Sequence, residues 1–321
     1  MRTWDRGFRD VYNAPVLRET PWFVIQGKRV DRSAQSRPCQ DAAANRVSLP
    51  PLLFSLFSHD YMGNLTYQLG WGTRPGGDPR WIAPALNFTM TFDVGTPFTP
   101  SAGCVAFVML DTCPFITSYL QYGPDSEERR VMMYRQLQQQ QNATQLRWFF
   151  EEVNRAAARC AAVVAVGHHP ILGGGRHAMN PLQQDLRTRF HLDDFFRSVG
   201  VDQYINGHDH LLMHNEEDAA GTAYILSGAG SNIRVGEMEE NIRDGYVTPT
   251  TKWWAEVGGF TVHSVNATHS SVAFVDAAGA VIHRVLKPLR AKNPNCGPDC
   301  APRPLGGEVH GMRPLTFSED D

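Results

Sequence analysis

Short runs of apolar and β-branched residues recur along the chain, and most are bounded by glycine or by polar residues. The runs are WFVIQG (22–27), CVAFVMLD (104–111), AAVVAVGHH (161–169), VDQYING (201–207), TAYILSGAG (222–230), GFTVHSV (259–265) and SSVAFVD (270–276). Short segments rich in β-branched and aromatic residues, with turn residues at their ends, are typical of buried β-strands. The pattern therefore predicts a strand at each run.

Two other segments have the spacing of an amphipathic helix. The first is expected from Asp125 to Ala162, where polar faces rich in Gln, Glu and Arg alternate with the apolar residues Leu137, Leu146, Phe149, Phe150 and Val153. We interpret its QLQQQQ tract as a solvated helix surface. A second helix is expected from Leu182 to Val199. Strands interspersed with helices indicate an α/β fold class.

Composition narrows the class of partner. The chain has 321 residues, of which 42% are hydrophobic, so it is long and apolar enough to bury a sizeable core. The formal net charge of −3 offers no electrostatic attraction for nucleic acid or for an anionic membrane. No apolar run approaches the roughly 20 residues that cross a bilayer. We expect neither a nucleic-acid partner nor a membrane partner.

Signals of cellular location disagree with one another. Four tripeptides match the glycosylation acceptor sequence, at 64–66, 87–89, 142–144 and 266–268, which favours a secreted glycoprotein. The first residues, MRTWDRGFRDVYNAP, contain no apolar segment of the kind found in signal peptides. The six cysteines are too few for a disulfide scaffold. Cys104 and Cys160 lie in apolar runs and are interpreted as buried thiols, whereas Cys296 and Cys300 either close a local loop or remain free.

Histidines follow two of the predicted strands. His168 comes directly after AAVVAVG, and His208 and His210 come after DQYING. Ligand sites in α/β sheets lie outside the carboxyl ends of strands, so both clusters are placed where chemistry is expected. Residues i and i+2 of an extended segment point the same way, which predicts that His208 and His210 face a shared centre or neighbouring metal ions. We expect the glycine before each cluster to let the backbone turn, His169 to have a packing role, and His214 to lie on the surface.

The motifs VAVGHHP, YINGHDH and TAYILSGAG resemble the later motifs of the metallophosphoesterases, most closely those of the purple (tartrate-resistant) acid phosphatases. The segments DVYNAPVLRETPWFVIQG, HDYMGNLTYQL, WIAPALNFTMTF, VAFVMLDT and TQLRWFFEEV follow the order of the same family. The resemblance covers most of the chain apart from 28–58 and the tail. It implies a four-layer α/β sandwich, with two mixed β-sheets face to face and helices outside. We expect a catalytic domain over residues 1–290 and a loosely packed tail over 291–321.

The resemblance also implies an activity and a site. The family hydrolyses phosphate monoesters with two metal ions, iron paired with iron, zinc or manganese, which activate a hydroxide and neutralise phosphate charge. By resemblance, His168 and His208 ligate the second metal and His210 ligates the first. His59 stabilises the transferring phosphoryl group or protonates the leaving alcohol, and His177 lies on the substrate side.

Two departures from the family pattern affect this expectation. The family's early Gly-Asp-x-Gly and Gly-Asp-x-x-Tyr motifs, which supply oxygen ligands, do not occur before Trp22. Its Gly-Asn-His-Asp motif is interrupted by residues 28–58. That segment ends in SLPPLLFSLFS, which suits either a translated intron, because pyrimidine-rich codons encode these residues, or a genuine apolar flap. Because this apolar end has no regular period, we expect it to pack loosely. We also expect this chain to bind fewer than two metal ions and to be inactive as it stands.

The sequence therefore predicts a monomeric acid phosphatase acting on a small phosphate ester, secreted or lysosomal/vacuolar in its full-length form. Two alternatives remain. One is another metallophosphoesterase, a phosphodiesterase or pyrophosphatase, and the other is a non-catalytic relative that uses the sandwich as a binding module. The intact GHHP and GHDH motifs favour an enzyme, because a binding module has no need of them.

Overall fold

A computed structural model describes the central part of the chain and not its ends. The described residues are 22–25, 53–56, 69, 71–73, 75–79, 81–93, 103–121, 135, 137, 139–140, 142–177, 185–218, 221–230, 232–247 and 249–292. The predicted catalytic residue His59, both C-terminal cysteines and the tail beyond 292 lie outside them.

A seven-stranded mixed sheet forms the centre of the fold, in the order β10-β8-β9-β7-β6-β5-β4. Its middle strands β5, β6, β7 and β9 are parallel, and β4, β8 and β10 each run antiparallel to a neighbour. The bounds are β4 Phe88–Asp93, β5 Cys104–Met109, β6 Ala162–Val166, β7 Gln203–Asn206, β8 Leu212–Asn215, β9 Ala223–Ser227 and β10 Thr251–Ala255. The strands predicted at β5, β6, β7 and β9 are confirmed.

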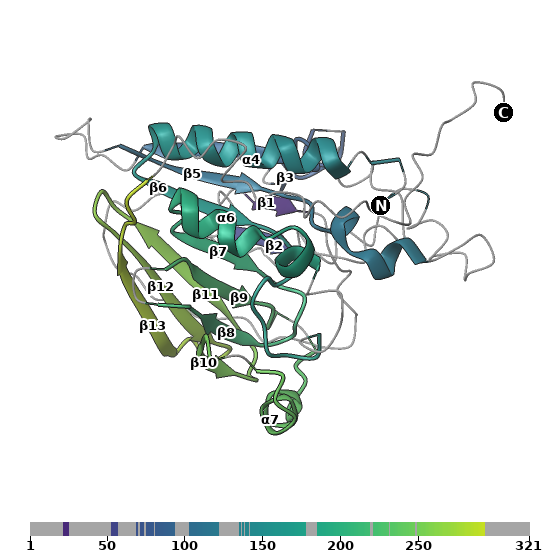
Figure 1. Cartoon of the computed structure of the whole chain (residues 1–321), viewed down its shortest axis with the longest axis vertical. Helices are drawn as coiled ribbons and strands as arrows, with labels where there is room; N and C mark the ends of the chain where they lie inside the picture. Colours follow the sequence, from purple (N-terminus) through teal and green to yellow (C-terminus); the bar gives the residue numbers. More distant parts are fainter. Residues whose placement is uncertain are drawn as a thin grey trace.

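Helices α4 (Asn142–Arg159) and α6 (Leu192–Val199) cover one face of this sheet (Figure 1). Phe149 and Val153 of α4 pack with Phe195 and Phe196 of α6 against buried residues of β5 and β6. Full burial of each such side chain is worth about 1.5–3 kcal/mol. The smaller helices are η4 (Cys113–Phe115), η5 (Thr117–Gln121), η6 (Asp185–Arg189) and α7 (Glu237–Arg243).

Both predicted segments contain a helix, and each is interrupted within the predicted range. A turn at Gln139–Gln140 precedes α4, and Ala162 already belongs to β6. In the second segment a π-helical turn, η6, is separated from α6 by His191, whose φ of 49° is left-handed and interrupts the regular hydrogen bonding. The QLQQQQ tract is not wholly a solvated surface, because the Gln140 side chain hydrogen-bonds to the buried Asp111.

Two smaller sheets complete the described fold. The antiparallel strands β11 (Gly259–Val265), β12 (His269–Asp276) and β13 (Val281–Pro288) pack through Val272, Phe274 and Val285 on the face of the central sheet that α4 and α6 leave open (Figure 1). The parallel strands β2 (Leu53–Leu56), β1 (Trp22–Ile25) and β3 (Trp81–Ile82) form the other sheet. The α/β class and two facing sheets are thus confirmed, while only one layer of helices occurs among the described residues.

Strand β2 lies inside the segment 28–58 that was expected to pack loosely. That expectation is wrong for Leu53–Leu56, which pair with β1 over four residues, from Trp22 with Leu53 to Ile25 with Leu56. A short apolar run without polar alternation is the pattern of a strand in a parallel sheet, which explains why no period of two was visible.

Cys104 and Cys160 form a disulfide, so their interpretation as free thiols is wrong. The reason is the sheet register. Val105 pairs with Ala162 on adjacent parallel strands, which brings Cys104, one residue before Val105, close to Cys160, two residues before Ala162, with a Cα–Cα distance of 4.5 Å. A Cα separation in this range permits a disulfide, and such bonds persist in oxidising compartments.

His214 is buried in β8, with 5% of its surface exposed, so its expected place on the surface is also wrong. Its Nε2 lies 3.1 Å from Glu216 Oε2, and the Lys287 ammonium on β13 donates to the other oxygen of the same carboxylate. This group, Glu216 with His214 and Lys287, joins the central sheet to the β11–β13 sheet.

Within the described ranges, no helix combines the length and the apolar character that crossing a membrane requires.

Candidate metal centre

The histidine clusters lie at one edge of the central sheet. His168 and His169 follow β6, and His208 follows β7, which is its parallel neighbour. Because the carboxyl ends of parallel strands meet at the same edge, the two clusters are brought together as predicted. His168 Nε2 lies 2.9 Å from His208 Nδ1, and one ligand atom from each of His168, His169 and His208 lies within 4.8 Å of the others.

His177 joins this cluster from the loop that follows β6. Its ring stacks on that of His208, with centroids 4.1 Å apart and planes at 28°. Its backbone N–H donates to Oδ1 of the fully buried Asp209, 3.2 Å away, which holds the loop against the strand end. The predicted substrate-side histidine thus lies in contact with a predicted ligand.

The backbone that carries His208 is not extended, contrary to the expectation from i and i+2 spacing. His208 has a φ of 65°, in the left-handed region that non-glycine residues rarely adopt. Two tight turns follow, in which Asp209 N–H donates to Gly207 O at 2.8 Å and Leu211 N–H donates to Asp209 O at 3.0 Å. Backbone strain of this kind costs about 1–3 kcal/mol and clusters at functional sites. His208 and His210 consequently do not share a direction through strand geometry.

Glycines near the strand ends allow neighbouring atoms to approach closely, and none of them is needed for a left-handed φ. Gly167 and Gly207 both have ordinary backbone angles. A Cβ on Gly167 would lie 2.4 Å from Tyr204 Oη, and a Cβ on Gly228 would lie 1.8 Å from the Asp209 carbonyl oxygen. A left-handed φ is therefore not what either glycine provides, and at Gly167 the requirement is close approach.

Thr112, three residues beyond the end of β5, organises the backbone of the first cluster. Its Oγ1 accepts the N–H groups of His168 and His169, each at 3.2 Å, and lies 2.7 Å from His169 Nδ1. A hydroxyl that already accepts two hydrogen bonds has its proton left to donate, so Nδ1 is the acceptor. Nε2 then carries the ring proton and donates it to Tyr119 Oη at 2.9 Å.

His169 therefore has both ring nitrogens engaged by the protein, which agrees with its predicted packing role. Burial lowers the pKa of His169 to about 3, so the ring is neutral across the physiological range. Thr112 and Tyr119 were missed by sequence reasoning. The signal for Thr112 was its position immediately after a predicted strand, and Tyr119 carried none.

His210 is held differently from the cluster. Its Nδ1 lies 2.7 Å from the carbonyl oxygen of Asn232, to which it donates. This fixes the tautomer and leaves Nε2 as a lone-pair donor, which is the usual arrangement of a metal-ligating histidine.

The residues at this edge fit a cation. The 2.9 Å between His168 Nε2 and His208 Nδ1 is close to the roughly 3.0 Å between two nitrogens at a right angle around one ion, at ligand distances of about 2.1 Å, and shorter than the roughly 3.4 Å of a tetrahedral site. Imidazole nitrogens suit zinc, iron and copper. The three-residue cluster found among the described residues contains no carboxylate.

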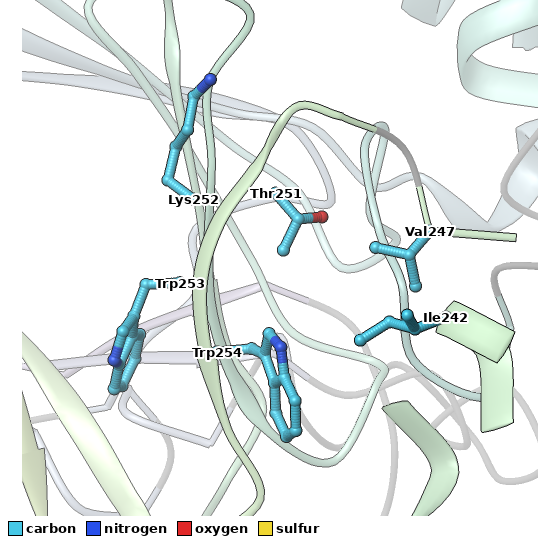
Figure 2. Close-up of a pocket in the computed structure, with 6 residues that line it drawn as sticks. All are labelled: Ile242, Val247, Thr251, Lys252, Trp253 and Trp254. Carbon is cyan, nitrogen blue, oxygen red and sulfur yellow. The ribbon is translucent and has the colours of Figure 1, made fainter. Parts of the chain in front are cut away.

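A hollow of about 350 Å³ lies elsewhere, between β10 and α7 (Figure 2). Trp254 points into it together with Ile242 and Val247, whereas Trp253 lies on the opposite side of the strand and stacks on His283. None of the residues that line the hollow is a histidine or carries a carboxylate, so it offers no site for the chemistry described above.

No family model matches the chain. The sequence is similar to human tartrate-resistant acid phosphatase type 5, with 26% identity over 290 residues that span 89% of this chain and 72% of the relative. It is also similar to purple acid phosphatase 3 of Arabidopsis thaliana, with 26% identity over 87% of this chain and 61% of the relative. The chain is a relative of the purple acid phosphatases.

The fold has a counterpart among solved structures. The Plasmodium protein described as "GAP50 the anchor in the inner membrane complex" matches with a TM-score of 0.52 and 20% identity, over 76% of this chain and 68% of that one. Both relatives are named as acid phosphatases, which are phosphomonoesterase-type hydrolases, and the histidine cluster of this chain lies at the edge of the sheet where ligand sites of α/β folds are expected.

Proposed function

We propose that this protein hydrolyses phosphate monoesters at the strand-end histidine cluster with the help of two bound metal ions. The observation that carries the proposal is the convergence of His168 and His208, 2.9 Å apart at the carboxyl ends of β6 and β7 in a relative of the purple acid phosphatases. Two metal ions would supply a hydroxide nucleophile and neutralise the charge of the phosphate.

The chain's own side chains then have distinct roles. His168 and His208 hold one ion, and His210, whose Nδ1 is fixed by Asn232, presents Nε2 to the other. His177, stacked on His208, lies beside the position of the substrate and donates to a phosphate oxygen. His59 assists the leaving alcohol, as the resemblance implies, and lies outside the described residues.

Metal affinity is expected to be low in the chain as printed. The described cluster offers imidazoles alone, and hard oxygen ligands are needed to hold iron in a two-metal hydrolase site. We therefore expect fewer than two equivalents of metal and little turnover from this chain by itself. The complete protein is proposed to be secreted or lysosomal/vacuolar, to act as a monomer on a small phosphate ester, and to have its catalytic domain within residues 1–290.

The test is metal content measured beside turnover. In the full-length gene product, His208→Ala should lower both zinc affinity and hydrolysis of p-nitrophenyl phosphate by more than tenfold, because a ligand is lost. His59→Ala should retain metal while turnover falls by about 10²–10⁴-fold, as expected for loss of a general acid. The exposed His269→Ala should change neither quantity.

Elemental analysis and steady-state kinetics on the same samples separate the possible outcomes. Loss of metal in His59→Ala with retention in His208→Ala would invert the proposed roles. Turnover of a diester or of pyrophosphate in preference to the monoester would identify one of the other metallophosphoesterase activities. A full-length protein that binds no metal at all would leave only a non-catalytic relative.

A further inference from the structure

The turn between β11 and β12 displays an acceptor sequence at the surface. Asn266, Ala267 and Thr268 are all exposed. Asn266 Oδ1 accepts hydrogen bonds from Thr268 N–H at 2.9 Å, from Thr268 Oγ1 at 3.2 Å and from His269 N–H at 2.8 Å. The turn is closed by Asn266 N–H, which donates to His269 O at 2.9 Å.

These hydrogen bonds use the amide oxygen of Asn266 and none of them uses its nitrogen. The hydroxyl of Thr268 is held against the same amide, and the two residues belong to an Asn-x-Thr acceptor sequence. An exposed hairpin tip also tolerates a bulky group. The side-chain nitrogen is therefore presented to solvent in a chemically suitable setting.

The acceptor sequence at Asn87 has the opposite environment. Asn87 Oδ1 accepts the backbone N–H of the buried Asp111 at 2.7 Å, and Phe88 is 7% exposed. Thr89 Oγ1 donates to Glu152 on α4 at 3.1 Å. A glycan on Asn87 would disturb the contact between β4, β5 and α4. We therefore expect Asn87 to have a structural role and to remain unmodified.

The β11–β12 turn also lies far from the histidine cluster. Strand β11 begins beside the cluster's edge, where Gly259 N–H donates to Ala229 O just beyond β9. It then runs to the other edge, where His263 Nδ1 pairs with Gln203 Oε1 at the first residue of β7. A large group attached at the far end of β11 leaves the cluster accessible.

The disulfide between Cys104 and Cys160 is an independent indication of compartment. Such bonds persist where the surroundings are oxidising, which includes the lumen in which asparagine-linked glycans are added. We propose that Asn266 is an N-glycosylation site of this protein. A lipid-linked oligosaccharyl pyrophosphate is the donor. The bond from Asn266 Nδ2 to the anomeric carbon forms, the bond from that carbon to the pyrophosphate oxygen breaks, and the amide proton is released with the pyrophosphate.

The experiment reads occupancy directly. The chain is expressed behind a cleavable signal peptide in mammalian cells, and peptides are analysed by mass spectrometry after enzymatic deglycosylation in heavy-oxygen water. We expect heavy-oxygen aspartate at position 266 and unmodified asparagine at position 87 of the secreted protein. Thr268→Ala should remove one glycan from the intact protein, and the matched Thr89→Ala should remove none.

Glycan transfer precedes secretion, so the same peptides are read from whole-cell extract if a variant is retained in the cell. Unmodified Asn266 in a chain that carries glycans elsewhere would overturn the proposal, as would a chain that carries no glycan at any site. A glycan on Asn87 of secreted protein would overturn the structural distinction between the two sequences. Metal content and turnover are unaffected by either threonine substitution, so failure here is distinct from failure of the proposed phosphatase activity.

Discussion

Asp111 is a buried carboxyl group whose pKa is changed by its surroundings. It lies fully buried just beyond β5, where its Oδ1 accepts the backbone N–H of Cys113 at 3.0 Å and where it also hydrogen-bonds to the Gln140 side chain. Burial raises the pKa of Asp111 to about 7, because desolvation of the charged form outweighs these hydrogen bonds. The group is therefore poised to change charge near neutral pH, at the same edge of the sheet as the histidines.

This raised pKa predicts a dependence of stability on pH. The group binds its proton more tightly in the folded than in the unfolded chain, so its contribution is fully present below about pH 4 and is lost as pH rises through 7. The loss amounts to about 4 kcal/mol at most. Asp111→Asn retains an oxygen to accept the Cys113 N–H and has no charge to bury.

We expect Asp111→Asn to be more stable than the parent protein by about 1–2 kcal/mol at pH 5 and by about 4 kcal/mol at pH 8. Urea unfolding at both pH values measures the difference. The control is Asp218→Asn at an exposed position, for which the difference in free energy of unfolding from the parent should be the same at both pH values. A variant that is equally destabilised at both pH values would show that Asp111 is ionised in the folded protein and held by its hydrogen bonds.

The ends of β6 and β7 are positioned by close approach between neighbouring elements. Gly167 leaves room for Tyr204 Oη, which donates to the carbonyl oxygen of His169 at 2.7 Å. Tyr204 is itself buried on β7, so its hydroxyl cannot move toward solvent. The strand end that carries His168 is thus held by Thr112, three residues beyond β5, and by Tyr204 of β7.

Gly167→Ala should consequently strain this edge of the sheet, because the added Cβ would meet Tyr204 Oη at 2.4 Å and Thr112 Cγ2 at 2.8 Å. Overpacking of this kind costs about 1–3 kcal/mol. Tyr204→Phe removes the nearer of the two atoms, so the double variant should recover part of the loss. Thermal unfolding of the two single variants and of the double variant measures the coupling, and strictly additive effects would contradict the proposed contact.

Each apolar run named in the sequence analysis contains a strand. Burial of a strand selects apolar and β-branched residues whichever other elements cover it, so the pattern is visible in the sequence alone. The placement of His168 and His208 at one sheet edge followed from the same pattern. What the sequence did not reveal depends on partners distant in the chain. The disulfide of Cys104 depends on the register of β5 with β6, and the backbone at Asp209, next to the left-handed His208, lies in close approach to Gly228. Gln140 was misread because its polar side chain binds a buried carboxyl and not water.

The two sheets of the sandwich are joined by apolar packing and by one buried ionic group. Leu212, Ala223 and Ile225 of the central sheet contact Val272 and Phe274 of the other. Beside this contact, Lys287 donates to Glu216 and to the carbonyl oxygen of Gly221, and the Lys287 and Glu216 side chains are 7% and 10% exposed. A buried pair of this kind contributes little net stability, because desolvation of both charges offsets their attraction. It does fix the position of one sheet relative to the other.

Removing one partner alone should be costly for this reason. We expect Lys287→Met to lower the free energy of unfolding by about 3–5 kcal/mol, because Glu216 is left charged and buried, held only by His214. The double variant Glu216→Gln, Lys287→Met removes both charges and should recover most of that stability. Urea unfolding of both single variants and of the double variant provides the cycle, with the exposed Lys252→Met as control. A loss below 1 kcal/mol in Lys287→Met would mean that water reaches Glu216, and that the sheets are held together by their apolar side chains alone.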